Sequence, residues 1–369
     1  MGWVRESIPD PPFYLIFWEG TRAEIMLAYT TRRILVLPFV LLGILLIIFG
    51  MLQLLSANQR LSTFISSPAE LKNTDIEVLK EEYGLNDPIW VRFGRWLDDV
   101  VHLRFGWSES AKMTAKRAFL RFFPVSIELA LWSALPIILG GIWLGTVAAV
   151  NHNNVVDHIT RLFAIVGWSL PSFVAGLLLL MVFYGGIVTW FPPGRLGLEA
   201  SEIVHSAQFV RYTQLNTIDA LLNWNWFVFT DAVRHIILPA IVMSYVRWAM
   251  LLRIMRSSLL ETLRKDYVQT ARAKGLKENV VIKKHARRNA LIPVVTVAGI
   301  YVAFLINGLV ITETIFDWHG LGRWAVTAAQ QFDTSTLMLF ALFNGVLLVL
   351  ANLVVDLIYA YLDPRVTYD

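Results

Sequence analysis

Six long apolar segments constrain the fold of this chain more than any other feature of its sequence. A helix needs about 20 apolar residues to cross a hydrocarbon core about 30 Å thick. Segments of this kind lie at about 34–55, 126–150, 162–188, 236–254, 290–311 and 337–361. Charged residues make up only 16% of the chain, against about 25% in a typical soluble domain. These features predict an all-α polytopic membrane protein with six transmembrane helices.

No glycine-rich linker and no internal repeat separates the apolar segments, so we expect one membrane domain at 34–369 after an N-terminal tail at 1–33. The first apolar run is too long for the hydrophobic part of a signal peptide and no small-residue cleavage site follows it, so we expect no cleavable signal. The longest connections between the segments lie at 56–125, 189–235 and 255–289.

The distribution of basic residues predicts the orientation of the chain. The connection 255–289 holds ten Lys or Arg and three acidic residues, whereas 189–235 and 312–336 together hold four Arg. Cytoplasmic loops are enriched in Lys and Arg, and connections longer than about 60 residues are largely exempt from this rule. We therefore expect 255–289 and both termini in the cytoplasm, and 56–125 and 189–235 outside. The net charge of +4 is then explained by topology better than by nucleic-acid binding.

Several kinds of active site are missing from the sequence. The chain has no cysteine, which excludes disulfides, thiolate metal sites and a cysteine nucleophile. It also lacks a G-x-x-x-x-G-K-[ST] phosphate loop, an H-E-x-x-H metal motif and a G-x-S-x-G nucleophile motif. We therefore expect no catalytic residue, no metal site and no nucleotide-binding site in this chain.

Charged residues within membrane segments are candidates for function, and three lie in or near the apolar segments. Glu128 and Asp356 are close enough to the ends of their segments to reach the interface. Arg247 lies deeper, and it either extends toward the interface or pairs with a carboxylate across a helix interface. No carboxylate is clearly at the midplane, where a proton-driven carrier would need one. Energy for any transport is therefore expected to come from another chain.

Prolines and small residues in the apolar segments indicate helices that bend and pack closely. Gly141 and Gly145 form a small-xxx-small pair that lets a neighbouring helix approach. Prolines, each of which removes a backbone donor and bends a helix, occur in or near five segments, at Pro38, Pro136, Pro171, Pro239 and Pro293. Any one of these residues is explained by ordinary packing. Together they suggest helices that cross around a cavity.

The connection 255–289 predicts two helical stretches with a stop between them. Residues from Leu259 to Lys274 include no proline or glycine and are expected to be helical. Gly275 suits the left-handed position that ends a helix. An amphipathic basic stretch from Glu278 to Asn289 then leads into the next apolar segment.

The end of the first helix is slim and positively charged, because Ala271 and Ala273 flank Arg272. A helix end of this kind fits a groove with acidic residues on its rim. The alternative is a solvated loop whose charges only set topology. The order of small, basic and small residues before Gly275, together with the amphipathic stretch that follows, favours docking to a partner.

The connection 255–289 resembles a motif of a known family of membrane proteins. The run from Tyr267 to Leu276 (YVQTARAKGL), followed by HARRNALIP ending at Pro293, resembles the EAA loop of ABC-importer permeases, especially the dipeptide/oligopeptide and nickel subgroup. Further segments resemble that subgroup over roughly residues 30–369: Arg32-Arg33, Tyr83–Pro88, Trp96-Leu97, Glu313–Phe316, Gly320–Arg323 and Leu362–Arg365. Together they favour the first of the two permease subunits of such an importer.

Four features depart from the pattern of that family. Gln269 stands where the general motif has Glu, and Gly275 is farther from Pro293 than in the general motif; the subgroup has both variations. His319 stands where the subgroup commonly has Pro, and residues 56–60 replace its usual turn after the first span. The tail 1–30 has no counterpart. These departures leave the expected coupling intact and put the solute in doubt.

The resemblance implies a type I ABC importer in a prokaryotic cell (inner) membrane, with this chain as one permease. Its partners would be a homologous second permease, two ABC ATPase subunits carrying ATP and magnesium, an extracytoplasmic solute-binding protein and the membrane lipid. The implied ATPase-coupling residues are Asp266, Tyr267, Thr270, Ala271, Arg272, Ala273, Lys274 and Gly275. Residues assigned to the translocation path are Glu128, Asn307 and Glu313.

Di- and oligopeptides are the first candidate for the solute, and oligosaccharides and nickel chelates are the alternatives within the subgroup. Aromatic residues in the external segments suit sugars as well as peptide side chains, so they do not decide between these solutes. Two other classes were weighed against an importer. A secondary carrier lacks the midplane carboxylates it needs, and a membrane-embedded enzyme lacks a catalytic group of His, Asp, Glu or Ser.

Overall fold

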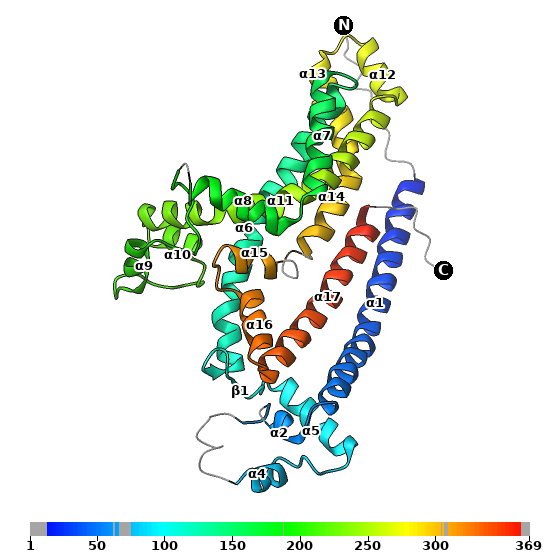
Figure 1. The fold of residues 1–369 in the computed structure, drawn as a ribbon. Helices are drawn as coiled ribbons and strands as arrows, with labels where there is room; N and C mark the ends of the chain where they lie inside the picture. Colours follow the sequence, from blue (N-terminus) through cyan, green and yellow to red (C-terminus); the bar gives the residue numbers. More distant parts are fainter. Residues whose placement is uncertain are drawn as a thin grey trace.

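Almost every regular element of this computed structural model is a helix (Figure 1). The structure describes the backbone of residues 13–61, 63–65, 75–186, 188–303, 305 and 309–362, and it describes the side chains of these residues except 13–30, 33, 57–58, 302–303 and 355–362. Asn307, the residues after Leu362 in the C-terminal motif, the residues before Phe13 and the side chain of Asp356 therefore lie outside what is described.

The elements up to residue 222 are α1 (Phe13–Gln53), α2 (Ala57–Leu61), α4 (Ile76–Glu82), α5 (Ile89–Val101), β1 (Trp107–Ser108), β2 (Met113–Thr114), α6 (Ala115–Val150), α7 (Val155–Ser169), α8 (Ser172–Phe183), α9 (Leu198–His205) and α10 (Asn216–Leu222). Those that follow are α11 (Trp226–Thr262), α12 (Asp266–Ala273), α13 (Glu278–Val280), the π-helix η1 (Val281–Ala286), α14 (Arg287–Ala303), α15 (Leu309–Ile315), α16 (Leu321–Gln330) and α17 (Thr334–Leu362). The strands β1 and β2 form a two-residue antiparallel pair.

Four helical segments in the described part of the chain are long and apolar enough to cross a membrane, namely Ile34–Gln53, Ala115–Val150, Trp226–Thr262 and Thr334–Val354. The pair α7 and α8 makes a fifth if it is counted as one bent span. The predicted segment 290–311 corresponds to α14, which has 17 residues, and to the chain that follows it. The structure thus supports a membrane protein with four or five candidate spans.

The predicted span at 162–188 is broken in the structure beside Pro171, one of the prolines expected to bend a helix. Helix α7 ends at Ser169, and α8 starts at Ser172 with its axis turned by 107°. Leu170, which precedes Pro171, has φ −86° and ψ 119°, because the proline ring disfavours the helical region for the residue before it. The Tyr245 hydroxyl of α11 donates a hydrogen bond to the Leu170 carbonyl oxygen at 2.7 Å, which fixes the break against the bundle.

Several helices run beyond their predicted spans. Helix α1 begins at Phe13, so part of the predicted tail 1–33 is continuous with the first span. Helix α6 begins at Ala115 rather than near 126, and α11 extends from Trp226 to Thr262 rather than from 236 to 254. Hydropathy locates only the apolar part of a helix. The helical backbone continues into the polar residues on either side, which a hydropathy pattern does not detect.

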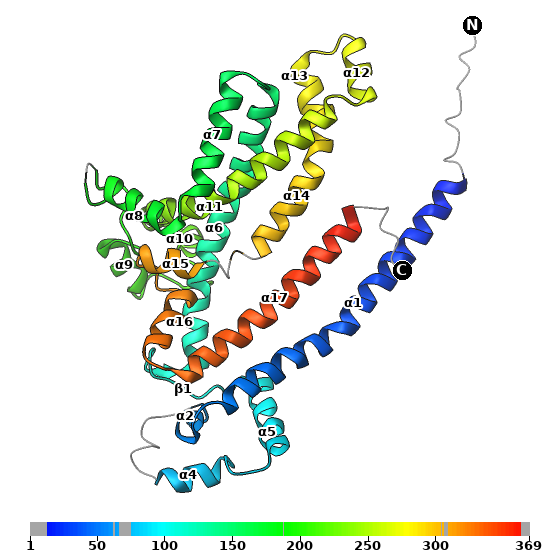
Figure 2. The same ribbon diagram turned by 45° about the vertical axis from the view of Figure 1, so that its right-hand side comes forward.

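The main core lies where α6 packs against α11, and α14 packs against both helices. Gly141 faces the Cβ atom of Leu251, and Gly145 faces Met255, so the small-xxx-small pair does bring the two helices together as predicted. Helices α1 and α17 run side by side next to this bundle (Figures 1 and 2).

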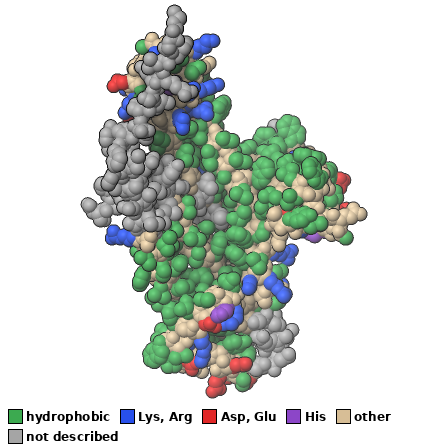
Figure 3. All heavy atoms as spheres, turned by 180° about the vertical axis from the view of Figure 1, so that it is seen from behind, with side chains coloured by type: hydrophobic (Ala, Val, Ile, Leu, Met, Phe, Trp, Pro, Cys, Tyr) green, Lys and Arg blue, Asp and Glu red, His purple; other side chains and the backbone are tan. Residues whose placement is uncertain are grey.

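The predicted coupling loop (255–289) and the described part of the predicted external region (56–125) lie at opposite ends of the molecule (Figures 1 and 2). Helices α12 and α13 cap one end of the bundle, and α2, α4 and α5 form the other. On the face that Figure 3 shows, apolar side chains cover most of the described surface between the ends, and Lys and Arg side chains gather at the end that holds α12 and α13. This arrangement is that of a bundle whose middle is solvated by lipid.

Candidate functional site

Helix α12 is a separate short helix, not the end of a longer one. The expected helix from Leu259 to Lys274 is interrupted, because α11 ends at Thr262 and Lys265 is extended with φ −70° and ψ 148°. No proline or glycine causes this turn. The turn at Lys265 lets the buried side of α12 pack against η1. Tertiary packing thus overrides the local preference for a continuous helix.

The buried side of α12 consists of Val268 and Ala271. Val268 is fully buried and Ala271 is 6% exposed, in one core cluster with Val281 and Ala286 of η1. Ala271 was predicted to form the slim docking surface, and here the structure corrects the prediction, since its methyl group faces the chain's own interior. The physical reason is that the apolar side of α12 is buried against η1 in the same core cluster.

The opposite side of α12 faces solvent. Asp266, Tyr267, Thr270, Ala273 and Lys274 are all exposed. The Tyr267 hydroxyl accepts a hydrogen bond from Asn289 Nδ2 at 2.7 Å, which ties α12 to the start of α14. The exposed face of these five residues, hereafter the α12 face, is therefore held in place from behind, and no described residue packs over its front.

Gly275 ends α12 in the left-handed conformation predicted for it, with φ +77°. Its N–H donates to the Arg272 carbonyl oxygen at 2.9 Å, and the Leu276 N–H donates to the Ala271 carbonyl oxygen at 3.4 Å. A Cβ atom at Gly275 would meet no other atom within 4 Å. The glycine is needed for its backbone conformation and not for close packing.

Arg272 is bound within the loop. Its Nε and Nη2 atoms donate to the two carboxylate oxygens of Glu278 at 3.1 and 2.7 Å, and its Nη1 donates to the Leu263 carbonyl oxygen at 3.4 Å. The guanidinium lowers the pKa of the Glu278 carboxyl below its usual value. Arg272 was expected to meet acidic residues of a partner. Within the chain it closes the loop around Gly275, with a fork geometry that suits a carboxylate, and its contact with a partner stays a prediction.

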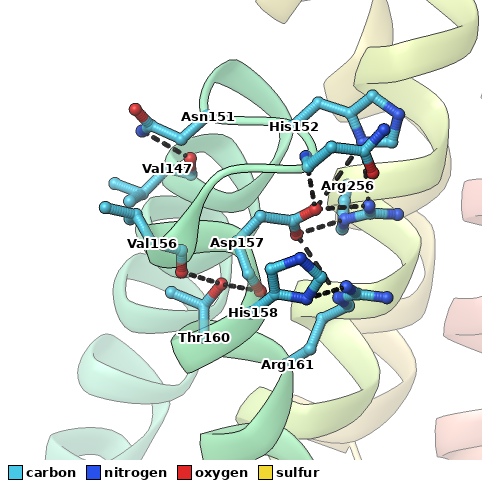
Figure 4. Close-up of polar contacts among 10 residues, drawn as sticks. Val147, Asn151, His152, Val156, Asp157, His158, Thr160, Arg161 and Arg256 are labelled. Atoms are coloured by element: carbon cyan, nitrogen blue, oxygen red, sulfur yellow. Dashed lines mark hydrogen bonds and ion pairs between the residues drawn. The ribbon is translucent and has the colours of Figure 1, made fainter.

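A buried ion pair ties α11, which leads into this loop, to α7 (Figure 4). The Asp157 carboxylate is completely buried and accepts hydrogen bonds from Arg256 Nε at 2.8 Å, Arg256 Nη2 at 2.7 Å and the Asn153 N–H at 3.0 Å. Arg161 Nε lies 3.7 Å away, and Arg256 Nη2 also lies 3.0 Å from His152 Nδ1. This cluster fixes the α6–α7 turn to the last turns of α11.

Neither Asp157 nor Arg256 was assigned a separate role from the sequence. Arg256 was one of ten basic residues in 255–289, and Asp157 lies between two apolar segments. The only available signal was an acidic and a basic residue near the ends of two apolar segments expected on the same side of the membrane. Nothing in a single sequence indicates that these two ends touch.

The two described translocation-path residues are buried and hydrogen-bonded. Glu128 is 1% exposed, because the segment after α9 folds over it. Its carboxylate accepts hydrogen bonds from Arg195 Nη2 at 2.6 Å, the Thr217 N–H at 2.7 Å and the Thr217 hydroxyl at 2.9 Å. It thereby joins α6 to α10.

Glu313 is completely buried at the end of α15. Its carboxylate accepts hydrogen bonds from the Ser126 hydroxyl and from the Arg323 N–H, the latter at 2.9 Å. It therefore holds the first turn of α16 against α6. Whether Glu128 and Glu313 also line a path for solute stays a prediction, as does the role of Asn307.

Among the described residues, no group of three or more His, Cys, Asp or Glu side chains is placed to hold a metal ion. The described geometry therefore consists of an exposed helix face on a basic loop, a buried ion pair behind it and a bundle with a lipid-facing surface. It suits the transmission of movement between a soluble partner and membrane helices.

Comparison with known proteins identifies the family. The model of the family of binding-protein-dependent transport system inner membrane components matches residues 141–368. The chain belongs to this family. The matched residues include α7, α11, the coupling loop and α17, so the resemblance indicated by the motifs is confirmed.

Curated relatives match nearly all of the chain. The dipeptide transport system permease protein DppB of Alkalihalophilus pseudofirmus is 34% identical over 343 residues, covering 93% of this chain and 100% of the relative. The oligopeptide transport system permease protein AppB of Bacillus subtilis is 35% identical over 344 residues, with the same coverage. The probable D,D-dipeptide transport system permease protein DdpB of Escherichia coli is 38% identical over 291 residues, covering 79% of this chain and 84% of the relative.

Membership of this family defines the general role of the chain. It is a multi-pass membrane component of a binding-protein-dependent transport system in a bacterial inner membrane. It is a transport subunit and not an enzyme, since members of this family carry no ATPase site of their own.

Proposed function

We propose that the chain is one of two permease subunits of an ATP-driven ABC importer and forms half of its translocation path for di- and oligopeptides. The support for the solute is that the relatives reported above are named as permeases of dipeptides, D,D-dipeptides or oligopeptides and align over most of this chain. Nothing in the described residues favours oligosaccharides or nickel chelates.

The complete importer contains a homologous second permease, two ABC ATPase subunits that bind ATP and magnesium, and an extracytoplasmic solute-binding protein. This chain contributes six spans, with α14 and the residues after it as the fifth, and with both termini in the cytoplasm. The external region 56–125 and the loop 189–235 receive the binding protein. The support for this orientation is the concentration of basic residues at 255–289.

The α12 face is the surface that docks into a groove of one ATPase. The observation that carries this proposal is that α12 is exposed on one side at the end of the bundle, while its other side is packed on η1 and α14. A helix mounted in this way moves together with its membrane helices. When ATP closes the ATPase pair, it favours one arrangement of the spans because it binds that arrangement better.

Uptake by the assembled importer tests the proposed function. Proteoliposomes containing this chain, the second permease, the ATPases and ATP should accumulate a labelled tripeptide only when loaded binding protein is present on the outside. Uptake of a labelled oligosaccharide or of a nickel chelate in place of the peptide would contradict the peptide assignment. Uptake of peptide without ATP would contradict the importer mechanism.

Two alanines on α12 test the docking surface. We expect Ala273→Glu to leave the permease folded and to reduce ATP-driven uptake at least about tenfold, since a charge is placed in a docked contact. Ala271→Glu should instead reduce the yield of folded protein, because it buries an unpaired carboxylate. The measurements are uptake, ATPase rate and recovery of monodisperse permease in detergent. Normal uptake by a folded Ala273→Glu variant would show that the α12 face is not the contact.

A further inference from the structure

An arginine without a carboxylate partner among the described residues lies within the membrane part of the bundle. Arg247 is in the middle of α11, nine residues before Arg256, which corresponds to about 14 Å along the helix axis. Its described hydrogen bond runs from Nη1 to the Met243 carbonyl oxygen of the same helix at 2.7 Å. Neither expected arrangement is found, since the side chain does not extend toward the coupling loop and forms no described ion pair.

The direction of the side chain matters. Met243 is one turn closer to the Trp226 end of α11 than Arg247, so the guanidinium points away from the basic loop and deeper into the bundle. A cation that extends toward the nearest interface lowers its cost in the membrane. Arg247 does the opposite, and charged residues kept at such a position usually serve a function.

The guanidinium faces a cavity of about 520 Å³. This volume lies within the range of about 300–1,000 Å³ found for pockets that bind small molecules. Tyr301 of α14, Thr312 of α15 and Trp168 of α7 line it together with Arg247, and the rest of the described lining is mainly aliphatic. The cavity is therefore an open, mainly apolar pocket with one cation and a few hydroxyl groups.

A second feature of this cavity favours an anion. Ser172, the first residue of α8, also lines it. The first N–H groups of a helix have no partner within the helix and carry a partial positive charge, so helix starts at breaks in membrane proteins bind anionic groups of solutes. The break before α8 is fixed by the hydrogen bond from Tyr245 to Leu170, which keeps this helix start in place.

We propose that this cavity is a binding site in the translocation path for the carboxylate of the solute, held by Arg247 and the start of α8. The proposal rests on the peptide importer proposed above, in which every unmodified peptide carries a C-terminal carboxylate. A planar guanidinium binds a carboxylate with two parallel hydrogen bonds. The aliphatic and aromatic lining accepts side chains of differing shape, as a peptide permease requires.

The test compares peptides with and without this carboxylate. Proteoliposomes of the complete importer are given trialanine or trialanine amide on saturating binding protein, and uptake and ATPase rates are recorded for the wild type and for Arg247→Gln. The binding protein prefers acid or amide to the same extent with the wild-type permease and with Arg247→Gln. This preference therefore cancels when the ratio of acid to amide uptake is compared between the two. We expect the ratio of acid to amide uptake to fall about tenfold or more in Arg247→Gln, with amide uptake nearly unchanged.

Two further variants control for charge and folding. Arg247→Lys should keep much of the preference for the acid, since it retains the cation. Arg253→Gln removes an exposed arginine of the same helix and should leave the ratio unchanged. An amide peptide with an internal Glu shows whether a side-chain carboxylate is accepted too, and its uptake should depend on Arg247 if the site takes any carboxylate.

Several outcomes would overturn the inference. An unchanged ratio, or an equal fall for acid and amide, would mean that Arg247 does not contact the carboxylate. Loss of the second permease from the purified Arg247→Gln complex would mean that Arg247 pairs with that subunit. Absence of any peptide uptake by the wild type would overturn the proposed function, and the inference with it.

Discussion

At the scale of single residues, the contact between α6 and α11 depends on Gly145. A Cβ atom at this position would lie 2.5 Å from the Met255 Cβ and 2.9 Å from the Leu252 carbonyl oxygen. Both are too close, and a carbonyl oxygen cannot move without shifting the helix. The small-xxx-small pattern was visible in the sequence, but only the structure identifies α11 as the helix that approaches.

We expect Gly145→Ala to lower the free energy of unfolding by about 1–3 kcal/mol through overpacking. The control is Gly43→Ala in α1, where a Cβ atom would meet nothing within 4 Å. Both substitutions gain the same helix preference of alanine, about 1 kcal/mol, so their difference isolates the packing cost. Thermal unfolding of the purified permease measures it. Equal unfolding midpoints for the two variants would argue against close packing at Gly145.

Asp333 is a second residue whose role depends on its surroundings. Its carboxylate precedes α17 and accepts hydrogen bonds from the Ser108 hydroxyl at 2.7 Å, the Ser110 N–H at 3.0 Å and the Thr336 N–H at 3.0 Å. Burial alone would raise the pKa of Asp333, but these hydrogen bonds hold it below its usual value of 3.8. The charged carboxylate thus joins the β1–β2 turn to α17.

A depressed pKa gives a defined pH dependence. The carboxylate of Asp333 contributes its stability above about pH 4, and the contribution is lost as the pH falls through the lower pKa of the folded state. We expect Asp333→Asn to cost about 2 kcal/mol near pH 7 and the difference from wild type to shrink below pH 4. Unfolding midpoints between pH 3 and 8 check this. The exposed Glu109→Gln in the same turn should have little effect, and a difference for Asp333→Asn that does not depend on pH would contradict the assignment.

At the scale of elements, the ion pair of Asp157 and Arg256 holds α7 to α11 just before the chain enters the coupling loop (Figure 4). Since α12 follows α11 after a short turn, this pair fixes the membrane helix through which movement of α12 would pass. Its energy cannot be read from the Coulomb attraction alone, because burying both charges has a large desolvation cost.

We expect Asp157→Asn or Arg256→Gln alone to lower the free energy of unfolding by about 3–5 kcal/mol, because each leaves a buried charge unpaired. The double variant Asp157→Asn with Arg256→Gln should lose much less than the sum of the two. A double-mutant cycle on unfolding midpoints measures the coupling. The exposed pair of Glu261 and Lys265 is the control, and additive effects at Asp157 and Arg256 would contradict a functional ion pair.

Some elements were predictable from the sequence and others were not. Long apolar runs located α6, α11 and α17, and Gly275 located the end of α12, because each of these signals is local. The turn between Thr262 and Asp266 was not predicted, and Pro171 predicted a bend between α7 and α8 but not its size of 107°. Their causes are packing of Val268 on η1 in the first case, and the combined effect of Pro171 and Tyr245 in the second.

At the scale of the whole molecule, the chain's lack of cysteine makes its orientation directly measurable. Single cysteines are introduced at three exposed positions: Lys274 in the coupling loop, Glu81 in the last turn of α4 and Glu199 in α9. In intact spheroplasts a membrane-impermeant maleimide should label Glu81→Cys and Glu199→Cys. It should label Lys274→Cys, and a cysteine added after Asp369, only after lysis. Labelling of Lys274→Cys from outside would reverse the proposed topology.

The sequence by itself determined that this chain is a helical membrane protein of the importer permease family, since apolar length and the coupling-loop motif are properties of contiguous residues. It also indicated the left-handed glycine and the small residues of α6. Only the tertiary structure decided that Ala271 faces inward, that Arg272 closes its own loop, that Asp157 meets Arg256 and that Arg247 faces a cavity. These facts depend on which distant segments touch, and contact between distant segments is set by the packing of the whole bundle and not by any local pattern.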